Sequence, residues 1–473
     1  MGYLDRITEF SNITVTPEEY GKSRITGKIT LETSSGPLEF RVVFTYSDDI
    51  EVDRNLAGLV LTMPVINFTL FSMKLTLDFP VSKADLDAIR EFVKINNREV
   101  FVNKLARRRY EFYRKEYLPS EEDITPQNAD GITEVVANEN YSDRLFKPAG
   151  GSAAVFSSGG KESLLSYGML KELDPETHAF FFNESGFHWL PAKTAHDYYM
   201  SHFKNVHKVW SNVDRFYRFV LRHMKIIDQK MVNSKTDTYP VQLFIFPVYI
   251  MSMVPVALKT GISGAVLGDE FDDPREMPPF HAIKHYYEVY DQTHDFNSFI
   301  SDYFHRKGID FTVWSAVYPI NGSVVEKILV NRYPELFRLQ RSCHSCRNVG
   351  GRIVPCGVCS KCLGILLFVL NAGGDPRKIE YSEESIRSLK QNVEKERMKL
   401  DPDELNLMKS NLGFIEIRNP EKFQHVPGIH MLPDEEIPFQ KVPEKYRDGI
   451  LGIVRQYSGG VFILSETGWV PVN

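Results

Sequence analysis

The chain has 473 residues, more than one hydrophobic core usually organises, so two or three domains are expected. Hydrophobic residues make up 42% and charged residues 25% of it, which excludes a disordered or fibrous chain and indicates a soluble globular protein. The formal net charge of -6 supplies no overall basic field, which argues against a dedicated nucleic-acid-binding protein.

Residues 1–118 predict an N-terminal domain of strands followed by a helix. Three segments rich in β-branched and aromatic side chains are expected to be strands: residues 24–33, 38–46 and 71–79. Ser82 is a candidate N-cap that pairs with Asp85, so a long helix or helix pair is expected to run from there toward Tyr117.

Three consecutive arginines, Arg107 to Arg109, lie near the end of this expected helix. They could contact phosphate or an acidic partner, although a solvated helix face is the simpler interpretation. Residues 119–150 contain proline, asparagine, aspartate and glycine without periodicity, so they predict a linker.

Residues 151–378 predict an α/β domain with a doubly wound parallel sheet, because short apolar runs alternate with helical stretches. The expected strands are residues 153–156, 178–182, 206–210, 264–267 and 310–314. In such sheets ligands bind beyond the carboxyl ends of the strands. The residues at four of these ends are Ser157, Asn183, Ser211 and Gly268.

The first of these strand ends carries a predicted phosphate loop, residues 157–163, which reads Ser-Ser-Gly-Gly-Lys-Glu-Ser. Gly159 and Gly160 let the backbone approach an anion, and the helix expected to follow directs its positive end toward the same charge. The side chains of Ser158, Lys161 and Ser163 would bind the same anion. The loop lacks the Walker A spacing, and the alternative is an ordinary turn from a strand into a helix.

Residues 241–258 approach the length of a membrane-spanning helix, but Pro247 and Pro255 interrupt them. In a chain otherwise rich in charge they predict a buried helix, and no membrane partner is expected. Residues 1–11 lack an apolar stretch of signal-peptide length, so we expect a cytoplasmic protein.

All five cysteines lie close together in the sequence: Cys343, Cys346, Cys356, Cys359 and Cys362. In a cytoplasmic protein such spacing predicts thiolate ligands of a metal, with zinc expected first and an iron–sulfur cluster or plain buried thiols as alternatives. The last three should act together, and either Cys343 or Cys346 would supply the fourth ligand.

Beyond these cysteines, residues 379–473 predict a C-terminal extension. Residues 382–412 have a helical pattern that Gly413 should stop, and the last sixty residues are interrupted by prolines and expected to form short strands.

The 157–163 loop resembles the S-G-G-x-D-S signature of the PP-loop ATP pyrophosphatases, with Glu162 in place of the usual aspartate. These enzymes split ATP between its α and β phosphates, and the resemblance implies a PP-loop, HUP-like fold. Over residues 152–378 the order of motifs resembles the 7-cyano-7-deazaguanine synthases. The flanking residues of that pattern favour Cys343 as the fourth zinc ligand and loop length favours Cys346; we predict Cys343.

The layout of the whole chain is also similar to that of the ATP-dependent epimerases acting on UDP-N-acetylmuramoyl-L-alanyl-L-glutamate. The shared features are an N-terminal β-rich domain, a G-G-K-acid-S loop, the turn Gly268-Asp269-Glu270 and a cysteine-rich end. Both resemblances imply that a carboxylate of a small molecule attacks the α phosphorus of ATP, which releases pyrophosphate and leaves an acyl adenylate.

The resemblances imply ATP, Mg²⁺ and Zn²⁺ as cofactors. Lys161, Ser163 and Asp273 would be catalytic. ATP would contact Ser157, Ser158, Gly159, Gly160, Lys161, Glu162, Ser163, Asn183, Gly268, Asp269 and Glu270. Mg²⁺ would bridge to Asp269, Glu270, Asp272 or Asp273, although these acids are also typical of an exposed turn. The alternatives are a tRNA-modifying PP-loop enzyme, with RNA as partner, and a non-catalytic nucleotide- and zinc-binding module; a homo-oligomer is compatible with all three.

Overall fold

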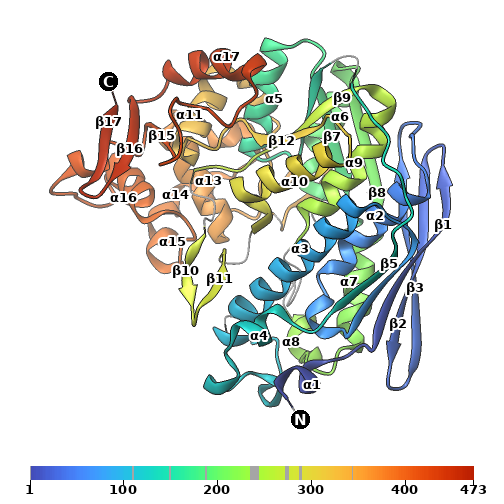
Figure 1. The fold of residues 1–473 in the computed structure, drawn as a ribbon. Coiled ribbons are helices and arrows are strands. Elements are labelled where there is room, and N and C mark those ends of the chain that lie inside the picture. The colour runs from blue at the N-terminus through green and yellow to red at the C-terminus, as the bar shows by residue number, and fades with distance from the viewer. Residues whose placement is uncertain are drawn as a thin grey trace.

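The computed structural model describes residues 2–108, 111–148, 151–186, 189–234, 244–271, 276–286, 290–343 and 345–472. Its centre is a ten-stranded mixed sheet, most of whose neighbouring strands are parallel (Figure 1). The strands are β1 (Asn12–Gly21), β2 (Arg24–Thr33), β3 (Gly36–Tyr46), β4 (Lys74–Pro80), β5 (Glu134–Asn138), β6 (Ser152–Phe156), β7 (His178–Asn183), β8 (Val206–Ser211), β9 (Ile262–Leu267) and β12 (Thr312–Ser315). Their order across the sheet is β12-β9-β6-β7-β8-β3-β2-β1-β4-β5.

The five strands predicted for residues 151–378 are present, and they lie side by side and parallel in the order β12-β9-β6-β7-β8. The chain proceeds from β6 outward to β8 in one direction and then returns to place β9 and β12 on the other side of β6. The strand order therefore reverses between β6 and β9, which is where ligands bind in open α/β sheets.

Helices cover both faces of this parallel half, as a doubly wound sheet requires. One face packs against α7 (Val213–His223), α9 (Phe246–Thr260) and α10 (His294–Arg306), and the other against α5 (Lys161–Leu173), α6 (Trp189–His202), α11 (Gly322–Arg332) and α13 (Ser360–Asn371). The fold class is thus α/β. Helix α9 is the buried helix predicted from residues 241–258, although residues 241–243 lie outside the described part of the chain.

None of the helices in the described ranges has the length and apolar character needed to cross a membrane.

The N-terminal half of the sheet contains the antiparallel strands β1, β2 and β3, with β4 and β5 added in parallel beyond β1. Strand β3 pairs with β8, where Phe44 lies opposite Ser211, so the sheet runs without a break from the N-terminal segment into the α/β part. The two predicted domains share this sheet.

The stretch predicted as a linker, residues 119–150, contains β5, which forms one edge of the sheet. This strand has five residues, of which only Val135 is buried, so it is too short to show a periodic pattern. Its backbone pairs with β4, with Leu75 opposite Val135.

Two helices cover the N-terminal strands: α2 (Arg54–Ile66) and α3 (Lys83–Glu99). Ser82 and Asp85 form the predicted capping box, since the Asp85 amide donates to Ser82 Oγ at 3.2 Å and the Ser82 amide donates to Asp85 Oδ2 at 2.9 Å. The helix does not reach Tyr117, because it passes into a π-helical segment, Val100–Ala106, and ends there.

The arginine run follows this π-helical segment, and Arg109 lies outside the described residues. The guanidinium of Arg107 lies 4.8 Å from the ring centroid of Phe280 in strand β10 (Met277–Phe280). The side chain of Arg107 therefore packs against strand β10.

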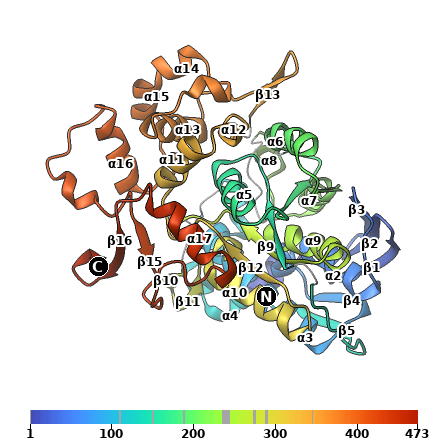
Figure 2. The same ribbon diagram turned by 90° about the horizontal axis from the view of Figure 1, so that it is seen from above.

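The single helix predicted over residues 382–412 is divided into α14 (Glu383–Arg387), α15 (Leu389–Lys395) and α16 (Pro402–Asn411). Asp401 caps a new helix start, where it accepts hydrogen bonds from the amides of residues 403 and 404, and Pro402 occupies the first turn. Gly413 follows with a φ of +68°, as predicted for a stop. These helices lie at the opposite end of the molecule from β1–β3 (Figures 1 and 2).

The last described residues form a three-stranded sheet and one helix. The strands are β15 (Ile429–Met431), β16 (Val461–Ser465) and β17 (Gly468–Val472), and the helix is α17 (Glu444–Arg455). Helix α17 packs on α5, and β15 contacts the segment after β12 through a bridge between Ile320 and Ile429. The C-terminal extension is therefore attached directly to the elements around the parallel sheet.

Candidate functional site

The 157–163 loop joins the end of β6 to the start of α5, with Gly160 as the N-cap. Gly159 has a φ of +79°, and a Cβ there would lie 3.0 Å from the carbonyl oxygen of Pro191. Ser163 Oγ donates to the Gly160 carbonyl at 3.0 Å and accepts from the Ser158 amide at 3.3 Å. The loop is thus a tight, hydrogen-bonded turn at a helix N-terminus, a geometry that binds anions.

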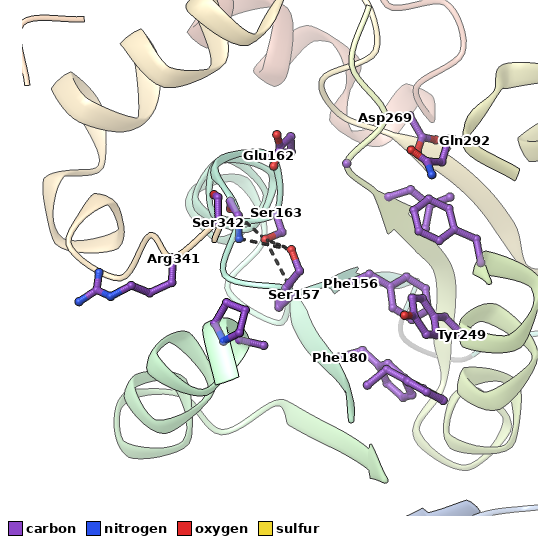
Figure 3. A pocket seen from close by; sticks show the side chains of 18 of the residues that line it. Phe156, Ser157, Glu162, Ser163, Phe180, Tyr249, Asp269, Gln292, Arg341 and Ser342 are labelled. Carbon is purple, nitrogen blue, oxygen red and sulfur yellow. Dashed lines mark hydrogen bonds between the residues drawn. The ribbon is translucent and has the colours of Figure 1, made fainter. Parts of the chain in front are cut away.

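A neighbouring segment holds this loop in place from the other side. The amide of Arg341 donates to the carbonyl of Gly159 at 2.8 Å. The guanidinium of Arg341 is buried and donates to backbone carbonyls, including that of Ile353 at 2.7 Å, and its side chain points away from Ser163 (Figure 3). Arg341 therefore connects the cysteine-rich segment to the loop and does not direct its charge at a ligand.

A cavity of about 450 Å³ lies beyond the carboxyl ends of β6, β7 and β9 (Figure 3). Its polar side contains loop residues 157, 158, 160, 162 and 163, the acidic turn 268–270, Ser342 and Lys361. Its opposite side is formed by five aromatic residues, which we call the aromatic wall: Phe156, Phe180, Phe182, Phe246 and Tyr249. The cavity thus combines an anion-binding end with an apolar end, and it lies where the strand order reverses.

Lys161 is buried in an ion-paired cluster below the polar side. Its ammonium lies 2.6 Å from Glu162 Oε1, 2.5 Å from Glu270 Oε1 and 5.0 Å from the ring centroid of Phe368. Burial alone would lower the pKa of Lys161, but the two carboxylates raise it above its ordinary value. Burial likewise would raise the pKa of Glu162, and the ammonium lowers it. The lysine therefore neutralises the two glutamates and does not face the cavity.

The acidic turn after β9 brings two carboxylates to the cavity. Asp269 is buried and accepts a hydrogen bond from Asn297 Nδ2 at 2.9 Å, and its backbone carbonyl accepts from Ser315 Oγ at 2.7 Å. A Cβ on Gly268 would lie 2.8 Å from Glu162 Cβ, so only glycine lets this turn approach the 157–163 loop. Asp272 and Asp273, the latter a predicted catalytic residue, lie outside the described residues.

Phe271 ends the described part of the acidic turn and is held by the C-terminal extension. Its ring stacks on His430 of β15 with centroids 3.9 Å apart and 16° between the planes, and Trp469 of β17 meets it edge-on at 5.4 Å. The extension thus fixes the position of the turn, although its sequence gave no functional signal.

Asn183 and Ser211, predicted at strand ends, are not among the residues that line the cavity. Asn183 Oδ1 accepts from the Ser185 amide at 2.9 Å, and Ser211 Oγ accepts from the Val213 amide at 3.2 Å. The cavity residue at the end of β7 is Glu184, because alternate residues of a strand share a face and Phe180 and Phe182 precede it. That alternation is the signal that would have identified Glu184 from the sequence.

Four cysteines meet in one cluster: Cys343, Cys356, Cys359 and Cys362, whose Sγ atoms all lie within 4.8 Å of one another. Among the described residues Cys346 is not part of this group, so the structure selects Cys343 as predicted. Cys359 caps α13 and Cys362 lies in its first turn. Four thiolates at this spacing could hold a metal ion such as zinc in a closed tetrahedral site.

The cysteine cluster adjoins the cavity through its sequence neighbours. Ser342 precedes Cys343 and Lys361 precedes Cys362, and both line the polar side of the cavity. A metal ion in the cluster would therefore fix the positions of two cavity residues without reaching the cavity itself.

No family model, curated protein or solved structure matches this chain. Backbone amides at the start of α5 can bind an anion, the carboxylates of Glu162, Asp269 and Glu270 can share a divalent cation with it, and the aromatic wall can stack a flat ring. These three capacities, at one strand-order reversal, fit a nucleotide with its metal.

Proposed function

We propose that the protein is a PP-loop enzyme that uses ATP to adenylate the carboxylate of a small molecule, releasing pyrophosphate and finally AMP. The observation that carries the proposal is the position of the 157–163 loop. It lies at the reversal of strand order, beside the acidic turn and on the rim of a cavity with room for a nucleotide. The loop sequence, which resembles the PP-loop signature, supports the same conclusion.

In this proposal the polar side of the cavity binds the phosphates of ATP. The amides at the start of α5 and the hydroxyls of Ser158 and Ser163 bind the phosphate oxygens. Glu162, Asp269 and Glu270 would hold Mg²⁺, which when bound neutralises charge on the departing pyrophosphate. Lys161 keeps Glu162 and Glu270 close together by offsetting their mutual repulsion.

The substrate is proposed to be a small carboxylic acid. One carboxylate oxygen attacks the α phosphorus, the bond from that phosphorus to the bridging oxygen breaks, and pyrophosphate leaves. The acyl adenylate can then form an amide or nitrile, as in the 7-cyano-7-deazaguanine synthases, or lose an α proton, as in the muramoyl-peptide glutamate epimerases. The acidic net charge supports a small molecule over RNA, because it gives little counterion release.

The cysteine cluster has a structural role in this proposal. Zinc is the metal proposed for it, since four thiolates leave no open coordination position for chemistry. It would keep Ser342 and Lys361 at the cavity while the reaction takes place.

The test is AMP formation from α-labelled ATP, first with a cytosolic metabolite extract and then with an RNA fraction. AMP formed with the metabolites supports the proposal. AMP formed only with RNA would identify a tRNA-modifying enzyme, and ATP binding without AMP in either case would identify a non-catalytic module.

A matched pair of glycine variants ties the activity to the loop. Gly159→Ala places a Cβ against Pro191 at a φ of +79° and should abolish AMP formation. Gly373→Ala imposes the same backbone penalty, at a φ of +76°, where no atom lies within 4 Å of the new Cβ, and should leave the activity intact.

A further inference from the structure

The aromatic wall begins next to the first residue of the 157–163 loop. The ring centroid of Phe156 lies 5.3 Å from that of Phe180 and 6.2 Å from that of Tyr249, and Phe182 lies 4.5 Å from Tyr249 (Figure 3). Ser157 follows Phe156 directly in the chain. A nucleotide whose phosphates lie on the loop can therefore place its base against these rings, which supply a stacking surface.

Aromatic rings can stack on any nucleotide base. Discrimination between bases therefore needs a polar group beside the aromatic wall. Glu184 is that group: it follows β7, lines the cavity and is only 7% exposed. Among the described residues that line the apolar end of the cavity, it is the one with a carboxyl group. Its carboxyl shares a hydrogen bond with Tyr249, a residue of the aromatic wall, so the carboxyl is positioned beside the rings.

The groups around Glu184 favour its neutral form. Burial, and then the charge of Asp214 on α7, raise the pKa of Glu184 to about 7, although a hydrogen bond with Tyr249 acts in the opposite direction. The other titratable groups beside it are Tyr217 on α7 and Tyr249 on α9, both neutral because burial raises their pKa well above the ordinary value. Arg218 lies 3.3 Å from Asp214 and is half exposed, so the cation is bound to Asp214 and not to Glu184.

We propose that the carboxyl of Glu184 recognises the edge of the purine base and sets the balance between adenine and guanine. This inference rests on the proposed function, because it presumes a nucleotide in the cavity. The protonated group donates its O–H to adenine N1 and accepts from the N6 amino group. The same protonated group can also pair with guanine, through O6 and N1–H, whereas the ionised group has two acceptors, which match only the N1–H and N2 amino donors of guanine.

Asp214 then acts as a positioning residue for the proton. Its negative charge adds to the effect of burial in raising the pKa of Glu184, and without it Glu184 would ionise at lower pH. The preference for ATP over GTP should therefore fall as pH rises, since the adenine-reading form loses its proton.

The experiment measures the binding of MgATP and MgGTP by calorimetry at about pH 6 and about pH 8. Both nucleotides carry the same triphosphate, so the ratio of their affinities cancels the titration of the phosphates. For the wild-type protein this ratio should fall by about tenfold or more between the two pH values. In Glu184→Gln, whose amide permanently offers one donor and one acceptor, the affinity ratio should become independent of pH.

A second variant tests the role assigned to the neighbouring charge. Asp214→Asn should move the fall in the ratio to lower pH. A ratio that is independent of pH in the wild type, or equally pH-dependent in Glu184→Gln, would overturn the inference while leaving the proposed function standing. Loss of AMP formation in Glu184→Gln with an unchanged affinity ratio would also overturn it, because that result assigns the carboxyl to proton transfer. If the wild type binds neither nucleotide, the proposed function fails and the inference fails with it.

Discussion

Lys161 and Glu270, which are 109 residues apart in the sequence, form an ion pair of 2.5 Å below the polar side of the cavity. Glu162 joins them at 2.6 Å, so one ammonium is shared by two carboxylates. The pair connects the start of α5 to the turn after β9 and so holds the 157–163 loop and the acidic turn together on the polar side of the cavity.

Removing the ammonium should destabilise the protein because it leaves two repelling carboxylates partly buried. We expect Lys161→Met to lower the free energy of unfolding by about 3 kcal/mol, measured by urea denaturation at neutral pH. The double variant Lys161→Met with Glu270→Gln should recover part of this loss, since it also removes one of the repelling charges. Glu270→Gln alone completes the comparison. If the effects of Lys161→Met and Glu270→Gln on the free energy of unfolding simply add in the double variant, the two side chains are not coupled.

The identity of the acid at position 162 should matter for turnover more than for folding. Glu162→Asp supplies the residue usual in the PP-loop signature and should retain AMP formation within about tenfold. Glu162→Gln has the same length without the charge and should lose at least about 100-fold in turnover. Activity of Glu162→Gln equal to that of the wild type would exclude a carboxylate role in the reaction.

The four-cysteine cluster should hold about one zinc per chain after anaerobic purification, as determined by elemental analysis. Cys343→Ser should lose the metal and lower the thermal midpoint, whereas Cys346→Ser, a change just outside the cluster, should keep both. A brown protein that contains iron and sulfide would show that the four cysteines hold an iron–sulfur cluster and not zinc. Metal retained in Cys343→Ser and lost in Cys346→Ser would reverse the choice of ligand.

The free energy of unfolding should fall at acidic pH, and Asp174 should contribute to this fall. Burial alone would raise its pKa, but hydrogen bonds led by that from Lys445 Nζ at 2.6 Å lower the pKa to about 2. A carboxyl with a lowered pKa stabilises the fold above its unfolded-state pKa, and the contribution is lost as pH falls from about 4 to about 2.

The test compares Asp174→Asn with the wild type by urea unfolding from neutral pH downward. The variant should be less stable by about 2 kcal/mol at neutral pH, and the difference should shrink below about pH 4. Asp448→Asn, on the exposed side of α17, is the matched control and should change stability little. A constant difference at all pH values would show that the ionised carboxyl of Asp174 is not responsible.

Features carried by short stretches of sequence were predictable. The 157–163 loop, the Ser82–Asp85 capping box and the cysteine cluster each depend on residues close together in the chain, so spacing alone indicates them. The parallel strands were also recognisable, because strands buried on both faces form continuous apolar runs, such as residues 153–156 of β6.

Features that depend on distant contacts were not predictable. Helix α2 is buried along nearly its whole length, so its apolar residues show no helical period. The pairing of β3 with β8 depends on how two parts of the sheet meet, and the stacking of Phe271 on His430 joins the acidic turn to a late strand. The pairing of Lys161 with two acids also reversed the expected role of that residue, since a lysine in such a loop is ordinarily read as a phosphate ligand.

The stack of Phe271 on His430 and Trp469 has a consequence for how the site matures during synthesis. A ribosome completes β6, α5 and the acidic turn long before it makes β15 and β17, and domains begin to fold while the chain is still emerging. A nascent chain that has reached α13 would already contain the walls of the cavity, but the aromatic partner that clamps its acidic turn would not yet exist. The Phe271 end of the acidic turn would therefore reach its final position only when the later strands dock, so that the site is completed after the sheet that supports it.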